Sequence, residues 1–254
     1  MRYCSALFLA CALLSAGCAS TAVSQAPTPA TATTPARAVV PKLSGKLTLD
    51  GKLDEAVWKK ALVLNPLTPN RGEGKDSEGT EVRVWYDDTA LYLSWVCTDK
   101  DIQGTFTNRD SMFWNEEVAE LFLAPDKLDK YYELQWNPLG AVFDAIIHNT
   151  LGPDGISKKI DGEWGYTAKG MRSAVKVDGT VANAKDEDKS WTVEAAIPFS
   201  DFNLTAPKPG TVWRANFYRF SRGKNNPELQ LSWSPTRLPS FHQPSKFGYL
   251  EFGK

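Results

Sequence analysis

Apolar and polar residues alternate in short runs through most of the chain from residue 42 onward. In the clearest pair of runs, 82–86 and 91–97, β-branched and aromatic residues flank an Asp-rich break. Alternation with a period of two is typical of a half-buried strand, and two such runs around a short turn predict a hairpin. Similar runs recur at short intervals, at 118–123, 131–137, 140–147, 171–177, 190–197, 211–220, 228–233 and 247–252.

One segment has a helical period instead. In 53–62, apolar residues recur near four-residue intervals after an Asp-Gly turn, and Asp54 is placed to cap the short helix that they predict. Trp58 would then pack against the sheets. Many strands separated by turns, with one short helix near the start, predict an all-β fold, an antiparallel β-sandwich.

The N-terminal segment follows a different pattern. Arg2 precedes an apolar run, 3–16, that is too short to span a bilayer, which is the layout of an export signal. The run ends in small residues before Cys18 and is similar to a bacterial lipobox. We therefore expect residues 1–18 to act as an export signal and Cys18 to be lipidated. Cleavage near Ala19, with release of a soluble protein, is the alternative.

Residues 19–41 are mostly Ala, Thr and Pro and contain almost no large apolar side chains. Such a segment cannot bury enough surface to offset the entropy of ordering it, so it is expected to be a disordered tether. The remaining residues, 42–254, suffice for one large domain with a buried core. We therefore expect an exported bacterial lipoprotein, at the outer membrane or facing the periplasm, whose single domain is a monomer.

Charge and cysteine usage exclude several classes of function. The net charge is −1 and no basic stripe is present, so nucleic acid is not an expected partner. Three of the four cysteines lie in the first eighteen residues, which leaves Cys97 without a partner for a disulfide in the domain. Cys97 follows an apolar alternation and is expected to be a buried thiol. The nine tryptophans are a high count, and a surplus at the surface would suit stacking on flat ligands.

Four segments carry candidate binding residues. Trp114 lies in a polar loop where a tryptophan has no obvious core role, and Glu120 interrupts an apolar strand, so its carboxylate needs buried donors or the hydroxyls of a ligand. Gln135 and Asn137 fall on one face of the next strand, together with Glu133, and could present amides to a ligand. Phe241 lies in a loop before the last strand, where packing alone would also explain it.

In their order along the chain, these segments resemble the family 9 carbohydrate-binding modules and their stand-alone relatives. The resemblance covers about residues 42–254. It rests on DGKLDEAVW (50–58), VRVWYDDTALYLSW (82–95), WNEEVAELFLAP (114–125), YYELQWNP (131–138), WTVEAAIPF (191–199), WRANFYR (213–219), SWSP (232–235) and FHQPSKFG (241–248).

The resemblance implies an immunoglobulin-like sandwich that binds an oligosaccharide or polysaccharide and catalyses nothing. The sugar would lie between two aromatic side chains, which match Trp114 and Phe241, with Glu120 beside it. Two positions depart from the family: Gln135 replaces a basic residue, and Phe241 replaces a tryptophan. No cofactor is required. Family members often hold structural calcium, for which Asp99, Asp101 and Asp110 are candidates by residue type alone and are not assigned.

Three other functions stay open. The sugar slot could be degraded and used for protein contact. A glycosidase needs two positioned carboxylates, and Glu120, Glu133, Asp144 and Glu194 are available, although no catalytic signature accompanies them. Haem-binding relatives of the sandwich need axial ligands, for which the chain offers Met112, His148 and Met171.

Overall fold

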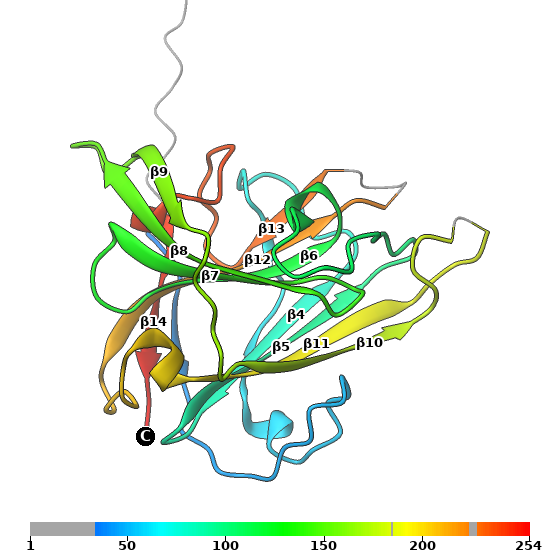
Figure 1. Cartoon of the computed structure of the whole chain (residues 1–254), viewed down its shortest axis with the longest axis horizontal. Coiled ribbons are helices and arrows are strands. Elements are labelled where there is room, and N and C mark those ends of the chain that lie inside the picture. Colours follow the sequence, from blue (N-terminus) through cyan, green and yellow to red (C-terminus); the bar gives the residue numbers. More distant parts are fainter. Residues whose placement is uncertain (1–33, 184, 224–227) are drawn as a thin grey trace, which may run out of the picture. The chain divides into compact units, whose positions relative to one another are not determined.

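A computed structural model describes residues 34–183, 185–223 and 228–254, which belong to one compact unit (Figure 1). The predicted export signal, Cys18 and the first part of the predicted tether lie outside the described residues. No helix within the described residues is long and apolar enough to cross a membrane.

Two β-sheets form the two layers of the domain (Figure 1). The first sheet has nine strands. Its main path runs β1 (Arg37–Val40), β14 (Gly248–Phe252), β12 (Val212–Ser221), β6 (Val118–Ala124), β7 (Lys130–Trp136), β8 (Val142–Leu151) and β9 (Ser157–Glu163). Off this path, β13 (Leu229–Ser232) pairs with β12, and β3 (Thr68–Pro69) pairs with β13.

The second sheet has five strands. They run β10 (Arg172–Asp178), β11 (Ser190–Pro198), β5 (Ala90–Thr98), β4 (Thr80–Tyr86) and β2 (Leu62–Leu64). The predicted hairpin is the antiparallel pair β4 and β5, with Val84 opposite Leu93. The predicted all-β sandwich is therefore confirmed.

The main core fills the space between the two sheets. It takes alternate residues of the first sheet, such as Leu121, Leu134 and Phe217, and packs them on Trp95 and Val193 of the second sheet. Cys97 is completely buried in this core, as the alternation predicts. The other face of the first sheet carries a second apolar cluster that includes Phe122, Tyr131, Phe143, Tyr218 and Phe241.

The domain begins earlier than the predicted boundary at residue 41. Arg37–Val40 forms β1, which pairs in parallel with β14, and the Val40 side chain is completely buried. An Ala/Thr/Pro composition concealed this strand, because only three residues, Ala38, Val39 and Val40, carry its apolar signal. The pairing of β1 with β14 also makes the first sheet mixed rather than wholly antiparallel.

The predicted helix over 53–62 is reduced to one 3-10 turn, η1 (Trp58–Lys60). Asp54 does not cap it, since the N-cap residue is Val57 and no side chain caps the turn. Trp58 is completely buried, as predicted, and its indole nitrogen donates to Glu194 Oε1 at 2.8 Å. The remaining 3-10 turns are η2 (Phe113–Asn115), η3 (Phe199–Phe202) and η4 (Pro244–Lys246).

Candidate functional site

A cavity of about 290 Å³ opens on the face of the first sheet that is turned away from the main core. We call it the slot. Its lining residues come from η2, β6, β7, β9, β12 and the loop before η4, and they are Trp114, Glu120, Phe122, Glu133, Gln135, Ile160, Trp164, Phe220, Pro239, Ser240, Phe241 and His242.

The polar floor of the slot is set by strand register. Glu120 on β6 lies opposite Gln135 on β7, and Phe122 lies opposite Glu133. Residues two apart in a strand share a face, so both carboxylates and the amide point to the same side of the sheet. Gln135 Nε2 donates to Glu133 Oε1 at 2.5 Å. Glu120 Oε2 and Gln135 Oε1 are buried and have no hydrogen-bond partner.

Two tryptophans, Trp114 and Trp164, lie beside this floor, and both contact Phe143. The Trp114 ring meets Phe143 edge-on, with centroids 5.7 Å apart, and the Trp164 ring lies 6.3 Å from the same Phe143. Trp114 is half-buried, whereas the Trp164 residue is 57% exposed. Gly162 lets the Trp164 indole lie against the strand, because a Cβ there would come within 2.4 Å of the ring.

The loop that carries Phe241 is held on the sheet by side chains of three strands. The Tyr218 hydroxyl of β12 donates to the Phe241 carbonyl at 3.0 Å, and the two rings are stacked. The Tyr131 hydroxyl of β7 bonds to His242 Nδ1 at 2.7 Å, and Asn149 of β8 donates to the His242 carbonyl. These contacts fix the wall of the slot that Phe241 and His242 form.

Burial dominates the electrostatics of the slot. Glu120 and Glu133 are 2% and 4% exposed. Burial, and for Glu120 also the charge of Glu133, raises the pKa of both carboxyls, that of Glu133 to about 8. Burial lowers the pKa of His242 to about 4, so its ring is neutral at pH 7. The carboxyls therefore hold protons that exposed glutamates would release.

Four of the five residues predicted from the sequence line the slot. Trp114, Glu120, Gln135 and Phe241 come together around it, although 127 positions separate the first from the last. Asn137 does not line it. Its side-chain oxygen accepts from the Ala141 N–H, and its side-chain nitrogen donates to the Phe106 carbonyl. The amide therefore connects the turn after β7 to the segment around Phe106.

Sequence reasoning missed several lining residues. Trp164 and Phe220 were not singled out, and Glu133 was noted as a neighbour on the same face and as a candidate glycosidase carboxylate, but not as a sugar-binding residue. A lone tryptophan between polar and glycine residues, at Glu163-Trp164-Gly165, is the same signal that singled out Trp114 and could have found Trp164.

The aspartates considered for calcium make contacts with other protein groups. Asp99 Oδ2 accepts from the buried Arg219 guanidinium at 2.7 Å, and Asp99 Oδ1 accepts the Asp101 N–H. Asp110 instead pairs with Arg109 at 3.8 Å. No group of three His, Cys, Asp or Glu side chains suited to a metal ion exists among the described residues. These three aspartates are therefore not gathered into one cluster of carboxylates.

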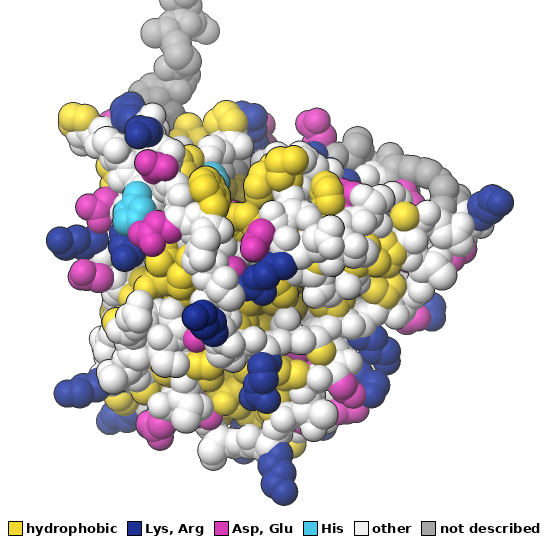
Figure 2. Space-filling view, viewed as in Figure 1, with side chains coloured by type: hydrophobic (Ala, Val, Ile, Leu, Met, Phe, Trp, Pro, Cys, Tyr) yellow, Lys and Arg dark blue, Asp and Glu magenta, His cyan; other side chains and the backbone are white. Residues whose placement is uncertain are grey.

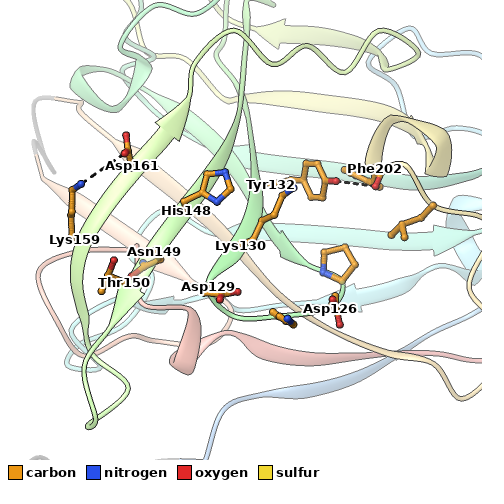
Figure 3. Close-up of a pocket in the computed structure, with 13 residues that line it drawn as sticks. Asp126, Asp129, Lys130, Tyr132, His148, Asn149, Thr150, Lys159, Asp161 and Phe202 are labelled. Atoms are coloured by element: carbon orange, nitrogen blue, oxygen red, sulfur yellow. Dashed lines mark hydrogen bonds and ion pairs between the residues drawn. The ribbon is translucent and has the colours of Figure 1, made fainter.

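A larger cavity of about 680 Å³ lies where β7, β8 and β9 extend beside residues 202–204 (Figure 3). Tyr132 and Phe202 lie at its base, and the Tyr132 hydroxyl donates to the Phe202 carbonyl at 2.8 Å. The strand register places Lys130 of β7 opposite His148 of β8, and His148 opposite Asp161 of β9. Basic and acidic side chains are mixed there, and the rings of Tyr132 and Phe202 are buried, so this cavity lacks the exposed aromatic platform that the slot has.

The charges on the surface follow the same mixed pattern. Figure 2 shows lysines and arginines interspersed with acidic side chains, while exposed hydrophobic side chains gather along the upper part of this face. The face drawn in Figure 2 therefore lacks the basic footprint that nucleic-acid binding needs.

A two-layered β-sandwich with an aromatic slot over one sheet face defines a ligand-binding module. The sequence model of carbohydrate-binding family 9 matches residues 75–252. Because the match spans more than half of the chain, the protein belongs to carbohydrate-binding family 9.

Solved structures share the fold. A candidate carbohydrate-binding protein from Bacteroides uniformis superposes with a TM-score of 0.65 at 18% identity, covering 86% of this chain and all of its own. A family 9 module from Caldicellulosiruptor kristjanssonii in complex with cellotriose gives 0.56 at 16% identity, with 85% and 93% of the two chains covered. A family 9 module from Caldicellulosiruptor kristjanssonii in complex with glucose gives 0.55 at 15% identity, with 85% and 97% of the two chains covered. No curated protein matches the sequence.

Proposed function

We propose that this protein binds carbohydrate in the slot, without catalysis, while anchored at the bacterial cell envelope. The single observation that carries the proposal is the slot itself, in which Trp114 and Phe241 stand around the unpaired polar atoms of Glu120 and Gln135. Membership of the carbohydrate-binding family and the sugar complexes of the Caldicellulosiruptor module support it.

The chemistry of a pyranose matches such a slot. Each ring has a face of C–H groups, which an aromatic ring removes from water, and a rim of hydroxyls that donate and accept hydrogen bonds. Buried acceptors without partners, such as Glu120 Oε2 and Gln135 Oε1, gain the most from a ligand that brings donors. The cavity volume of about 290 Å³ suits one or two sugar units, near the lower end of small-molecule sites, roughly 300 Å³.

The arrangement of the carboxylates argues against a glycosidase. Such an enzyme places its two carboxylates on either side of the scissile bond. Glu120 and Glu133 project from adjacent strands on one face, so they approach a ligand from one wall only. Asp144 accepts from the Ala168 N–H and pairs with Arg109, and Glu194 accepts from Trp58, so both of these carboxylates hold the fold together.

The haem alternative lacks converging ligands in the described part of the chain. His148 lines the larger cavity, Met171 packs against the main core, and Met112 is exposed. Protein contact through a degraded slot is the remaining alternative, and failure of every sugar to bind would favour it.

The envelope location rests on the sequence of the N-terminal segment. The proposed lipid on Cys18 would hold the domain at a membrane through the segment that precedes β1. Cys18→Ala should move the protein from the membrane fraction to the soluble fraction. An unaltered protein that is fully soluble, with an unacylated N-terminus, would contradict the anchor.

Calorimetric titration against a panel of soluble oligosaccharides tests the binding function. Trp114→Ala should weaken binding about tenfold, since base–aromatic stacking gives a scale of about 1–3 kcal/mol for one lost platform. Lys130→Ala changes the larger cavity and serves as the matched control, with affinity unchanged. If no sugar binds the unaltered protein at millimolar concentration, or if Lys130→Ala rather than Trp114→Ala abolishes binding, the slot proposal is wrong.

A further inference from the structure

Glu120 and Glu133, which we call the acid pair, give the slot a floor that accepts hydrogen bonds and offers few donors. Glu133 Oε1 already accepts from Gln135 Nε2, which leaves Gln135 Oε1 and Glu120 Oε2 without partners. The Gln135 amide oxygen only accepts, and a carboxyl group that loses its proton also only accepts, so a ligand that brings donors would satisfy these atoms. A sugar hydroxyl offers one donor, whereas an ammonium group offers three and also carries a positive charge.

The acid pair has no compensating cation among the residues that line the slot. None of those described residues is a lysine or an arginine. His242 is neutral at pH 7, with Nδ1 bonded to the Tyr131 hydroxyl. The Arg222 guanidinium lies near the slot, with its Cζ 5.0 Å from the centroid of the Phe220 ring. It donates to the Trp114 carbonyl at 2.9 Å. Two buried like charges are costly, so the acid pair holds protons in the absence of a partner, and a cation is the partner that would allow it to ionise.

Aromatic rings enclose the space above the acid pair. Trp114, Trp164, Phe220 and Phe241 all line the slot. The faces of such rings carry negative electrostatic potential and attract a cation within about 6 Å. A carboxylate floor under aromatic walls is therefore complementary to an organic ammonium group in both charge and shape.

We propose that the slot selects a sugar carrying a cationic amine, of the 2-amino-2-deoxyhexose class, over neutral, N-acetylated and acidic sugars. The inference rests on the proposed sugar-binding function and names its ligand class. The ammonium group lies against Glu120 and Glu133, and the C–H face of the ring stacks on Trp114. A uronic acid would add a third carboxylate to the slot, and N-acetylation would remove the charge.

Binding of an ammonium group also moves protons. The groups that face the acid pair from its surroundings are Tyr218 on β12, Tyr131 on β7 and His242 in the loop, and all three are neutral at pH 7 because burial shifts the pKa of each in the direction of its neutral form. An arriving cation lowers the pKa values of the acid pair, so a proton leaves the protein on binding. Affinity for the amino sugar therefore rises with pH as long as its amine stays protonated, and affinity for a neutral sugar does not.

Calorimetry on the full chain tests the inference with four probes: glucose, glucosamine, N-acetylglucosamine and glucuronate. We expect glucosamine to bind about tenfold more tightly than glucose, as one charge-assisted hydrogen bond provides, and glucuronate to bind most weakly. Titration in two buffers that differ in ionisation enthalpy should show proton release with glucosamine only. Glu133→Gln should bring the ratio of the two dissociation constants close to one, while Glu187→Gln, an exposed glutamate paired with Lys100, should keep it.

The outcomes separate the two proposals. Equal binding of glucose and glucosamine without proton release would overturn the amine preference and leave the sugar slot standing. If none of the four probes binds, the sugar-binding function itself fails and the inference fails with it. If Glu133→Gln does not fold, the affinity ratio and the proton release of the unaltered protein still decide the matter.

Discussion

The ring of Phe241 lies flat against the ring of Tyr218, with centroids 4.0 Å apart and planes inclined by 12°. One face of Phe241 is therefore already covered by protein. The side chain also touches Phe220, at a centroid distance of 4.7 Å, and the residue is only 5% exposed. Phe241 thus closes the second apolar cluster and lines the slot at the same time.

Because of these two roles, we expect substitution of Phe241, unlike that of Trp114, to change stability as well as binding. Phe241→Ala should lower the free energy of unfolding by about 3 kcal/mol, the cost of removing a buried Phe side chain, and should also weaken sugar binding. Thermal melts and titrations on the same preparation measure both effects. Phe241→Leu, which keeps most of the apolar volume, should recover most of the stability but not the binding. Unchanged stability in Phe241→Ala would show that the loop packs elsewhere in solution.

Trp164 offers a site for changing affinity without changing stability. Because the residue is 57% exposed, Trp164→Ala should leave the melting temperature nearly unchanged and weaken binding about fivefold, at the low end of the range for one lost platform. Gly162→Ala should weaken binding as well, since the new Cβ displaces the indole from the strand. Full affinity in both variants would remove Trp164 from the site.

The acid pair predicts an unusual dependence of stability on pH. Burial raises the pKa of Glu133 to about 8 in the folded protein, so the folded state holds a proton that the unfolded chain releases above about pH 4.3. The folded state is then favoured at low pH, and this contribution falls as pH rises towards 8. The lowered pKa of His242 acts in the opposite direction only between about pH 4 and 6.5.

The test compares urea unfolding of the unaltered protein with that of Glu133→Gln at several pH values. Between pH 6.5 and 8 the stability of the unaltered protein should fall relative to the variant, by at most about 1.4 kcal/mol per pH unit. Glu187→Gln, whose carboxylate is exposed, should follow the unaltered protein. Parallel curves for the protein and for Glu133→Gln would mean that Glu133 is ionised in the folded state.

A buried arginine ties the two sheets together. Arg219 on β12 is completely buried and donates to Asp99 Oδ2 at 2.7 Å and to the Thr98 carbonyl at 3.0 Å. Arg219→Met should destabilise the domain by about 3 kcal/mol or more, because Asp99 and the neighbouring Glu117 would lose their buried cation. Denaturant unfolding measures this loss, and Arg214→Met, in a partly buried site, is the control expected to lose less.

Two truncations locate the start of the domain. Removal of residues 19–33 should leave the melting temperature unchanged, whereas removal of residues 19–40 deletes β1 and the buried Val40. Burial of one valine contributes about 1.5–3 kcal/mol, which corresponds to a shift of about 4 °C or more in a domain of this size. Equal melting temperatures would show that β1 is not needed.

The sequence alone predicted ten of the fourteen described strands and the faces of their residues, but it missed β1, β2, β3 and β9. Alternation has a period of two, so the position of Glu120 between Val118 and Phe122 was enough to place its carboxylate with their side chains. The burial of Cys97 and of Trp58 followed from the same local patterns. These properties depend on a few neighbouring residues, which is why no knowledge of the fold was needed.

Only the tertiary structure decided how the site is composed. Trp164 and Phe220 line the slot because β9 and β12 lie in the same sheet as β6 and β7, and strand order cannot be read from alternation. Asn137 shares the alternation of Gln135 but turns its amide to the backbone of Phe106 and Ala141. The alternation of residues along a strand determines the sheet face from which a side chain projects. The hydrogen-bond partners that the fold brings within reach decide whether its polar atoms remain for a ligand.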